Sequence, residues 1–424
     1  MDYTFFPMTD FEKLEQAVTA LYGAAAAPAQ MERYRRLFQG LTDTFGSCDR
    51  AAVFSAPGRT EIGGNHTDHQ HGKVLAGSVN LDIIAAVAPN GEKVIRVQSE
   101  GFPMAAVDLD DLEVHPEEYN QFISILRGTA AWFARQGCPL EGFNAYITST
   151  VFKGSGLSSS AALEVLLGNI FNSLFHKNKC TPVEIAQIGQ YAENVYFGKP
   201  SGLLDQMASS VGGMVAIDFA DNDHPIVEKV DFDFAATGYA LCIIDSGADH
   251  ADLTDEYAAV TMELKKVCTH FGKSVLREVP GEELFAALPE LRKECGDRAV
   301  LRALHVYHEN DRVDNQVAAL RRGDFDFFLS EIRESGLSSW RYLQNVVPAG
   351  YTEHQDVAFA LALAEHLLDT AGACRVHGGG FAGTIQAFVP LDMLEGFKAG
   401  IERTLGEGKC YVLTIRPVGG VRLV

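Results

Sequence analysis

The chain has 424 residues, 47% of them hydrophobic, and its 35 basic and 56 acidic side chains give a formal net charge of −21. This length exceeds what one hydrophobic core usually serves, so we expect two domains. The acidic balance disfavours nucleic acid and anionic membranes as partners.

The first part of the chain predicts a helical leader within residues 1–50. Residues 11–45 have helical periodicity, with an alanine-rich break at 24–29.

The opening residues are acidic and lack the basic start and apolar core of a signal peptide. No apolar run reaches the roughly 18 residues of a membrane span, and the eight cysteines are scattered without a C-x-x-C pair, which is typical of reduced thiols. We therefore expect a cytoplasmic protein.

Strand-like and helix-like segments alternate from the leader to about residue 215. Strands are predicted at 74–87, 94–98 and 143–150, and helices at 119–135, 161–174 and 182–197. A second block is predicted to contain strands at 214–218, 239–245, 410–416 and 420–424, and helices at 253–271, 299–321 and 354–370. This order predicts an α+β fold with mixed sheets, divided into an N-terminal domain, 1–215, and a C-terminal domain, 216–424.

A polar segment lies between a strand-like stretch at 51–55 and the apolar run that follows. It contains Arg59, Glu61, Asn65, His66, Thr67, Asp68 and His69. We interpret it as a functional loop, in which Arg59 contacts an anion and the other groups bind hydroxyls. A polar surface loop, with Arg59 in a surface ion pair, is one alternative. A metal site built from His66, Asp68, His69 and His71 is another.

A glycine- and serine-rich segment follows the strand predicted at 143–150. Its glycines allow close approach to an anion, and its serines stand where the free N–H groups of the next helix converge. We predict a phosphate cradle formed by Gly154, Ser155, Gly156, Leu157, Ser158, Ser159, Ser160 and Ala161. The segment is neither a Walker loop nor a Rossmann fingerprint. A capped helix after a flexible loop is the alternative.

Three consecutive glycines, Gly378, Gly379 and Gly380, lie between strands predicted at 373–376 and 385–389. Such a run costs backbone entropy, so we expect another group to approach the main chain there. A tight hairpin is the alternative.

These three segments resemble the three motifs of the GHMP small-molecule kinases, most closely the galactokinase branch, whose first motif is G-R-x-N-x-I-G-E-H-T-D-Y. Residues 202–206 resemble its G-I-M-D-Q, and His250 with Glu256 and Tyr257 resembles its H-x-x-x-x-x-E-Y. The resemblance implies a two-domain GHMP-kinase-like fold with the active site in the interdomain cleft. It also implies ATP-dependent phosphorylation of galactose at the anomeric hydroxyl, with Mg²⁺, by a monomer or weak homodimer.

The resemblance implies roles for individual residues as well. Asp205 would act as general base or orient the sugar hydroxyl, although by itself it could be a helix N-cap. Arg59 would stabilise the transferring phosphoryl group and lower the pKa of Asp205. The remaining roles are sugar binding by His66, Asp68, Asp205 and Tyr257, and Mg²⁺ binding by Ser160 and Glu193, with Ser159 as a rival to Ser160.

The chain departs from the family pattern on the sugar side. Asn65 replaces the family's glutamate, His69 replaces its tyrosine, and Glu61 stands where the motif has asparagine. Because an amide carries no charge that repels a substrate anion, galacturonate is an alternative substrate at a site that includes Asn65. The D-H-Q run at 68–70 resembles that of plant galacturonate kinases. Against galacturonate, the sequence shows no additional cation near the matching sugar contacts to pair with a substrate carboxylate.

A sensor that binds galactose and ATP without transferring phosphate is an alternative from a different class. A yeast paralogue of the family with that role lacks the small dipeptide after the serines. Ala161 and Ala162 are present here, and so are Asp205 and Arg59. This complete set favours an enzyme.

Overall fold

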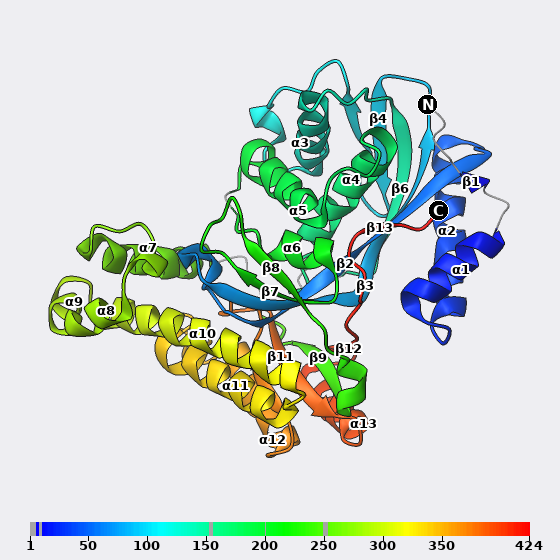
Figure 1. Cartoon of the computed structure of the whole chain (residues 1–424). Coiled ribbons are helices and arrows are strands. Elements are labelled where there is room, and N and C mark those ends of the chain that lie inside the picture. The colour runs from blue at the N-terminus through cyan, green and yellow to red at the C-terminus, as the bar shows by residue number, and fades with distance from the viewer. Residues whose placement is uncertain (1–5, 8–10, 152–155, 200, 249–252) are drawn as a thin grey trace.

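The computed structural model describes residues 6–7, 11–151, 156–199, 201–248 and 253–424. Two β-sheets form its framework, one of nine strands and one of four, and helices cover both (Figure 1). The strands of the larger sheet are β1 (Phe6–Pro7), β2 (Arg50–Gly63), β3 (Lys73–Pro89), β4 (Val94–Ser99), β5 (Ala105–Asp108), β6 (Phe143–Ser149), β7 (Met214–Asp218), β8 (Ile226–Val230) and β13 (Val421–Arg422). The smaller sheet contains β9 (Tyr239–Asp245), β10 (Ala373–Val376), β11 (Thr384–Pro390) and β12 (Cys410–Leu413).

The larger sheet is mixed, and its long strands β2 and β3 are buried on both faces. Its order is β1-β2-β3-β6-β4-β5, with β13 beside β2 and the pair β7-β8 beside β3, and β4 runs parallel to β6. Successive side chains of a strand point to opposite faces. Ala51 and Val53 accordingly belong to the core under the N-terminal helices, whereas Ala52 and Phe54 belong to the core under α4.

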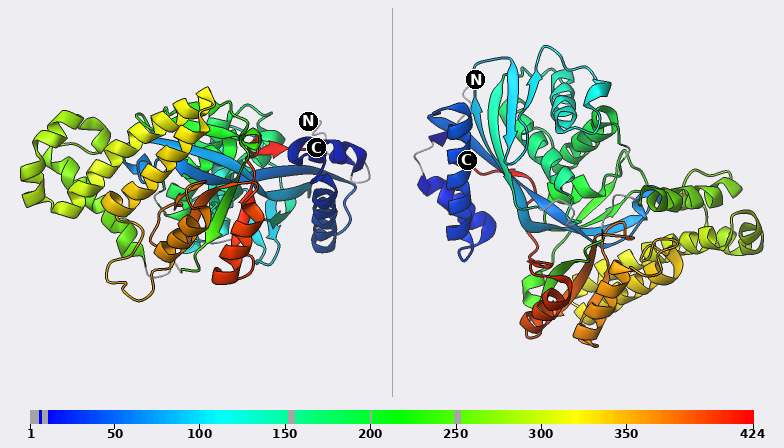
Figure 2. Two further views of the ribbon diagram at one scale, coloured as in Figure 1. Left: turned by 90° about the horizontal axis from the view of Figure 1, so that it is seen from below. Right: turned by 180° about the vertical axis from the view of Figure 1, so that it is seen from behind.

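Two groups of helices cover these faces, and they lie on opposite sides of the sheet (Figure 2). The N-terminal helices are α1 (Phe11–Tyr22) and α2 (Ala27–Phe45). The other side carries α3 (Phe122–Arg135), α4 (Ser159–Phe175), α5 (Pro182–Tyr191), the π-helical turn η3 (Ala192–Phe197) and α6 (Leu204–Val211). A capping box between Thr181 and Glu184 starts α5.

The smaller sheet is antiparallel throughout, in the order β10-β11-β9-β12. Helices α12 (Asp356–Leu368) and α13 (Leu394–Leu405) pack on the face that carries Cys242 and Ile244. The other face, with Leu241 and Ile243, joins the main core together with α11 (Phe325–Ser338).

A group of helices extends away from the two sheets (Figure 1). It consists of α7 (Thr254–His270), α8 (Gly281–Ala286), α9 (Leu288–Glu294) and the start of α10 (Asp297–Arg322). These helices share a core of their own, which includes Leu264, Leu284 and Val306. Short helical turns complete the chain: η1 (Asp68–Gln70), η2 (Pro116–Glu118), η4 (Phe234–Thr237), η5 (Leu276–Glu278) and η6 (Ser339–Leu343).

The predicted α+β fold is confirmed, and most predicted elements lie within a few residues of their expected bounds. Two strand predictions were too long, because β12 ends at Leu413 and β13 covers only Val421–Arg422. The division near residue 215 stays a prediction, but β7 and β8 hydrogen-bond into the larger sheet, so a boundary there would fall inside β7.

The structure also bears on the membrane and cysteine predictions. Within the described part of the chain, no helix has the length and apolar character needed to cross a membrane. None of the eight cysteines, all of which lie in the described part of the chain, forms a disulfide, and four of them, Cys242, Cys268, Cys374 and Cys410, are buried.

Candidate functional site

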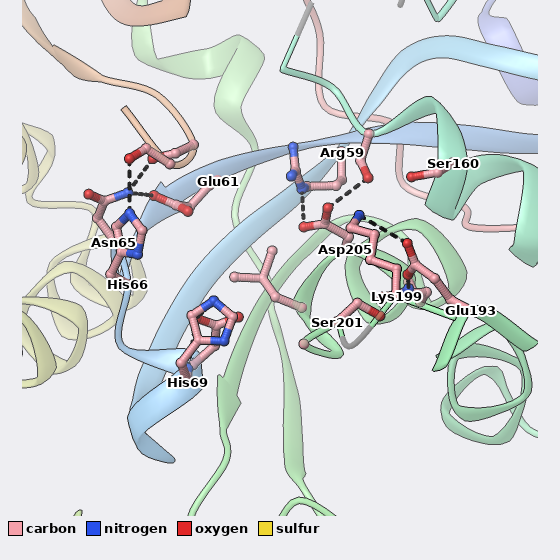
Figure 3. A pocket seen from close by; sticks show the side chains of 17 residues that line it. Arg59, Glu61, Asn65, His66, His69, Ser160, Glu193, Lys199, Ser201 and Asp205 are labelled. Atoms are coloured by element: carbon pink, nitrogen blue, oxygen red, sulfur yellow. Dashed lines mark hydrogen bonds and ion pairs between the residues drawn. The ribbon is translucent and has the colours of Figure 1, made fainter. Parts of the chain in front are cut away.

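A polar cavity of about 280 Å³ lies beside β2, and all three sequence motifs contribute to its wall (Figure 3). The lining residues are Arg59, Glu61, Asn65, His66, Asp68, His69, Ser158, Ser160, Glu193, Lys199, Ser201, Gly202, Leu204, Asp205, Gln206, Gly378 and Gly379. The structure therefore brings together segments that are more than 300 positions apart in the sequence.

The interpretation of the first motif as a loop was wrong for its first half. Strand β2 continues to Gly63, so Arg59 and Glu61 lie on the strand and two positions apart, which points both side chains to one face. The pairing with β3 shifts register between Pro57 and Arg59 and again between Glu61 and Gly63. Such irregularities re-aim side chains next to functional sites.

Asp205 lies at one end of the cavity, in the first turn of α6. Arg59 Nε donates to its Oδ1 at 2.7 Å and Ser158 Oγ donates to its Oδ2 at 2.6 Å. Burial opposes ionisation of this carboxyl, but Arg59 and Ser158 outweigh it and hold the pKa of Asp205 below its ordinary value. The N-cap alternative for Asp205 is wrong, because Leu203 occupies the N-cap position of α6.

The glycine- and serine-rich segment reaches this end of the cavity. The Gly156 carbonyl accepts from Arg59, and the Leu157 carbonyl accepts from the Arg59 amide at 3.0 Å. Ser158 occupies the N-cap position of α4 in a left-handed conformation, with φ of 54°, and its hydroxyl bonds Asp205 instead of capping the helix. Ser159 opens α4, Ala161 is buried, and the predicted cradle residues Gly154 and Ser155 lie outside the described residues.

Glu193 and Ser160 line the cavity next to Asp205. Glu193 belongs to the turn η3 and is almost fully buried, whereas Ser160 is exposed. Glu193 Oε1 pairs with Lys199 Nζ at 3.1 Å, and its Oε2 accepts from Gln206 Nε2 at 3.0 Å. The same Gln206 amide donates to Glu164 at 2.9 Å, and burial together with the Glu193 charge raises the pKa of Glu164 well above its ordinary value.

Asn65 lies at the other end of the cavity, and its amide is engaged by the protein. Its Nδ2 donates to Glu61 Oε1 at 3.0 Å and to the Gly378 carbonyl, while its Oδ1 accepts from Asn345 Nδ2 at 2.8 Å. Glu61 also pairs with the buried Arg375 at 2.9 Å, although burial still raises the pKa of Glu61 above its ordinary value. Relative to the family motif, the carboxylate and the amide have exchanged positions within one hydrogen-bonded pair.

His66, Asp68 and His69 line the same end of the cavity. His66 has φ of 59° and its Nε2 bonds the Gly379 carbonyl at 2.9 Å. Burial lowers the pKa of His66 to about 4, so the imidazole is neutral near pH 7 and donates this hydrogen bond. Asp68 is close to Gly202, where an added Cβ would lie 2.5 Å from Asp68 Oδ2.

Tyr257 is not among the residues that line the cavity, although we predicted a sugar contact there. Its hydroxyl donates to the Gly380 carbonyl at 2.7 Å and its ring packs edge-on against Phe381. A Cβ on Gly379 would lie 2.7 Å from the Tyr257 ring, so this position of the glycine motif requires glycine. Tyr257 therefore contacts the glycine motif and does not face the cavity directly. His250, which matched the same family stretch, lies outside the described residues.

The alternative metal site at His66, Asp68, His69 and His71 gains no support from the geometry. Among the described residues, no three His, Cys, Asp or Glu side chains are grouped to hold a metal ion. His71 Nε2 lies 3.1 Å from Asn222 Nδ2 and does not line the cavity.

Several residues of the site were not predicted. Arg375 and Asn345 reach the first motif from 314 and 280 positions away, and no local pattern marks such contacts. Gln206 stood inside the matched G-L-L-D-Q run, which could have singled it out. Glu164 lies at the end of the glycine- and serine-rich segment but was given no role, and Lys199 lies outside the three motifs.

Comparisons with known proteins agree with this arrangement. The family model described as the galactokinase galactose-binding signature matches residues 41–89, and the model of the GHMP kinases N terminal domain matches residues 124–213. A galactokinase of Streptomyces coelicolor is 30% identical over 373 residues, which cover 87% of this chain and 90% of that protein. A galactokinase of Glaesserella parasuis is 30% identical over 367 residues, or 84% and 89% of the two chains.

Solved structures give the same picture. The crystal structure of Lactococcus lactis galactokinase complexed with galactose aligns with a TM-score of 0.77 and 26% identity, covering 92% of this chain and all of that one. A mevalonate kinase structure, at 13% identity and a TM-score of 0.61, shares the fold. The chain belongs to the galactokinase family of GHMP kinases.

Proposed function

We propose that this protein transfers the terminal phosphoryl group of ATP to the anomeric hydroxyl of galactose, releasing galactose 1-phosphate, ADP and a proton. The observation that carries the proposal is Asp205, whose two carboxylate oxygens are held by Arg59 and Ser158 at one end of a polar cavity. The cavity is also lined by residues of the galactose-binding signature.

In the proposed mechanism, Asp205 accepts a hydrogen bond from the anomeric hydroxyl and orients its oxygen toward the phosphoryl group. Because Arg59 keeps the pKa of Asp205 low, this carboxylate positions the hydroxyl before it takes up a proton. Once Arg59 shares its charge with the phosphoryl oxygens, the pKa of Asp205 rises and proton transfer becomes easier.

The donor set beside Asp205 fits Mg²⁺. Glu193 offers a carboxylate oxygen and Ser160 an exposed hydroxyl in the same cavity, and Mg²⁺ prefers a small number of protein oxygens together with water and phosphate oxygens. Bound there, the ion would neutralise charge on the ATP phosphates. Ser158 and Gly378, which also line the cavity, would border the nucleotide.

Galacturonate remains the second substrate in the test, but the geometry does not favour it. Glu61 returns a carboxylate to the sugar end of the cavity, next to the position where Asn65 removes one. A substrate carboxylate would face this group, and the nearby Arg375 is already paired with Glu61. A cytoplasmic location and a monomeric or weakly dimeric state stay predictions.

The test is ADP release from MgATP in the presence of galactose, galacturonate, glucose, N-acetylgalactosamine, arabinose and mevalonate. We expect galactose to give the highest kcat/KM. Preference for galacturonate would contradict the substrate assignment, and binding of galactose and ATP with no ADP release would favour the sensor.

A further inference from the structure

Lys199 supplies a cation to the cavity that no motif predicted. Its Nζ lies 3.1 Å from Glu193 Oε1, and its side chain is 59% exposed, whereas that of Glu193 is 5% exposed. The carboxylate is therefore fixed in the wall, while its partner approaches from the open side of the cavity.

The backbone fixes where Lys199 starts. Gly198 ends the turn η3 with φ of 82°, a conformation that favours glycine, and the Lys199 amide donates to the Glu193 carbonyl at 3.2 Å. From this anchored Cα, a four-carbon stem carries the ammonium into the cavity, and such a stem has several rotamers. Figure 3 shows Arg59 on one side of Asp205 and Lys199 on the other.

The inner side of Glu193 is already occupied. Its Oε2 accepts from Gln206 Nε2, and the same amide also donates to Glu164. The outer oxygen of Glu193, Oε1, is bonded to Lys199 Nζ and is therefore the oxygen at which one cation can be exchanged for another.

A divalent cation at Glu193 would repel the Lys199 ammonium, because both would occupy the same carboxylate oxygen. The displaced ammonium remains in a cavity that also holds Arg59 and Asp205. The strongest anion that enters this cavity under the proposed function is the transferring phosphoryl group, and cations placed on its oxygens stabilise phosphoryl transfer.

We infer that Lys199 is a further catalytic residue, which neutralises Glu193 in the empty site and moves to an oxygen of the transferring phosphoryl group when a divalent cation takes Glu193. The inference rests on the proposed function and adds a second cation to Arg59. It also predicts that Lys199 contacts the terminal phosphate of the nucleotide and competes with the metal when no nucleotide is bound.

The first experiment compares calorimetric affinities for MgADP and for the Mg²⁺ complex of an ATP analogue with a methylene bridge between its β and γ phosphates. Lys199→Met is expected to lower the affinity for the analogue about tenfold more than the affinity for ADP, because only the analogue has the terminal phosphate. Lys199→Arg, which keeps the positive charge, is expected to retain most of the wild-type affinity for the analogue. Lys93→Met, which removes an exposed lysine paired with Asp110, is the matched control and should change neither affinity. Equal effects on ADP and the analogue would overturn the inference.

The second experiment measures binding of Mn²⁺ alone by electron paramagnetic resonance. Lys199→Met should bind Mn²⁺ severalfold more tightly than the wild type, because its competitor for Glu193 is gone. Unchanged Mn²⁺ affinity would contradict the occupancy of Glu193 by Lys199. Neither experiment requires turnover, so a wild-type protein that phosphorylates no sugar would overturn the proposed function without deciding these two results.

Discussion

Asp205 combines two demands that conflict in an ordinary carboxylate. It is ionised because Arg59 and Ser158 stabilise its charge, yet a group held this way is a weak proton acceptor. The conflict is resolved if Arg59 turns toward the phosphate during the reaction, since the pKa of Asp205 then rises at the moment when the sugar hydroxyl loses its proton.

Replacement of Asp205 by Ala is therefore expected to reduce kcat by about 10³-fold or more, in line with the loss of a positioned acid–base group. Binding of MgADP should be retained, because the described contacts of Asp205 are to Arg59 and Ser158. Asp218→Asn, at an ion pair with Arg277 that does not line the cavity, is the control. Retained turnover in Asp205→Ala would displace Asp205 from this role.

The exchanged pair Glu61 and Asn65 makes a second prediction at this scale. Asn65→Glu would place a second buried carboxylate beside Glu61, where the amide is now 3.0 Å away. We expect a rise in the KM for galactose of about tenfold and a loss of stability of about 3 kcal/mol, typical of an uncompensated buried charge. The double variant Glu61→Asn/Asn65→Glu should recover most of both, because it again has one carboxylate and one amide. A double variant no better than Asn65→Glu would show that the two positions are not interchangeable.

Among the elements, the β10–β11 connection is the one whose backbone shape decides the site. Its carbonyls at Gly378 and Gly379 accept from Asn65 and His66, and Gly380 accepts from Tyr257. Three glycines are used for different reasons. Gly378 and Gly380 have positive φ, whereas Gly379 is confined by the Tyr257 ring.

Gly380→Ala and Gly378→Ala test this difference. Both add strain at positive φ, but a Cβ at Gly380 would also lie 2.2 Å from the Asn345 carbonyl oxygen. Among the described residues, apart from its own chain neighbours, none has an atom within 4 Å of a Cβ at Gly378. We expect Gly378→Ala to cost about 1 kcal/mol of unfolding free energy. Gly380→Ala should cost about 3 kcal/mol and raise the KM for galactose, because Asn345 also holds Asn65. Denaturant unfolding and initial rates measure both, and equal costs would contradict the account.

Over the whole molecule, β2 connects the two sheets through buried polar contacts. Arg375 on β10 donates to the Ile62 carbonyl, Gln386 on β11 donates to the Glu61 carbonyl, and His305 on α10 bonds the Asn65 carbonyl. Buried polar groups are costly to leave unpaired. The two parts of the chain are therefore expected to unfold together.

Stability should fall as the pH drops from about 6.5 to 4, because buried imidazoles are neutral in the fold. Burial lowers the pKa of His66 and His305 to about 4 and that of His377 well below its ordinary value. Unfolded imidazoles bind protons first, so each contributes stability above pH 6.5 and loses up to about 1.4 kcal/mol per pH unit below it. Glu309 also contributes to stability, and this contribution is lost only at lower pH. Burial opposes its ionisation, but the charge of Arg312 outweighs burial and lowers the pKa of Glu309 to about 2.

Denaturant unfolding between pH 4 and 8 measures this slope. His305→Gln removes one titrating imidazole and should flatten the curve, whereas the exposed His354→Gln should leave it unchanged. A slope that is the same in all three proteins would contradict the assignment.

The sequence predicted local elements well and distant contacts poorly. The apolar run at 74–87 and the periodicity at 161–174 depend on neighbours in the chain, and both became elements of nearly the expected length, β3 and α4. The continuation of β2 through the first motif was missed, because polar residues there are buried by partners such as Arg375 and Asn345 that lie far along the chain. For the same reason the bonds of the Asn65 amide to Glu61 and Asn345 were missed, while its contact with the sugar stays a prediction.

The most direct measurement is the position of the phosphate in the product of galactose and MgATP, determined by ³¹P and ¹H nuclear magnetic resonance for the wild type and Asp205→Ala. The account predicts phosphorus coupled to the anomeric proton in the wild-type product, and product formation slower by about 10³-fold or more with Asp205→Ala. Phosphate on any other hydroxyl, or product formed by Asp205→Ala at the wild-type rate, would contradict the placement of the anomeric hydroxyl beside Asp205.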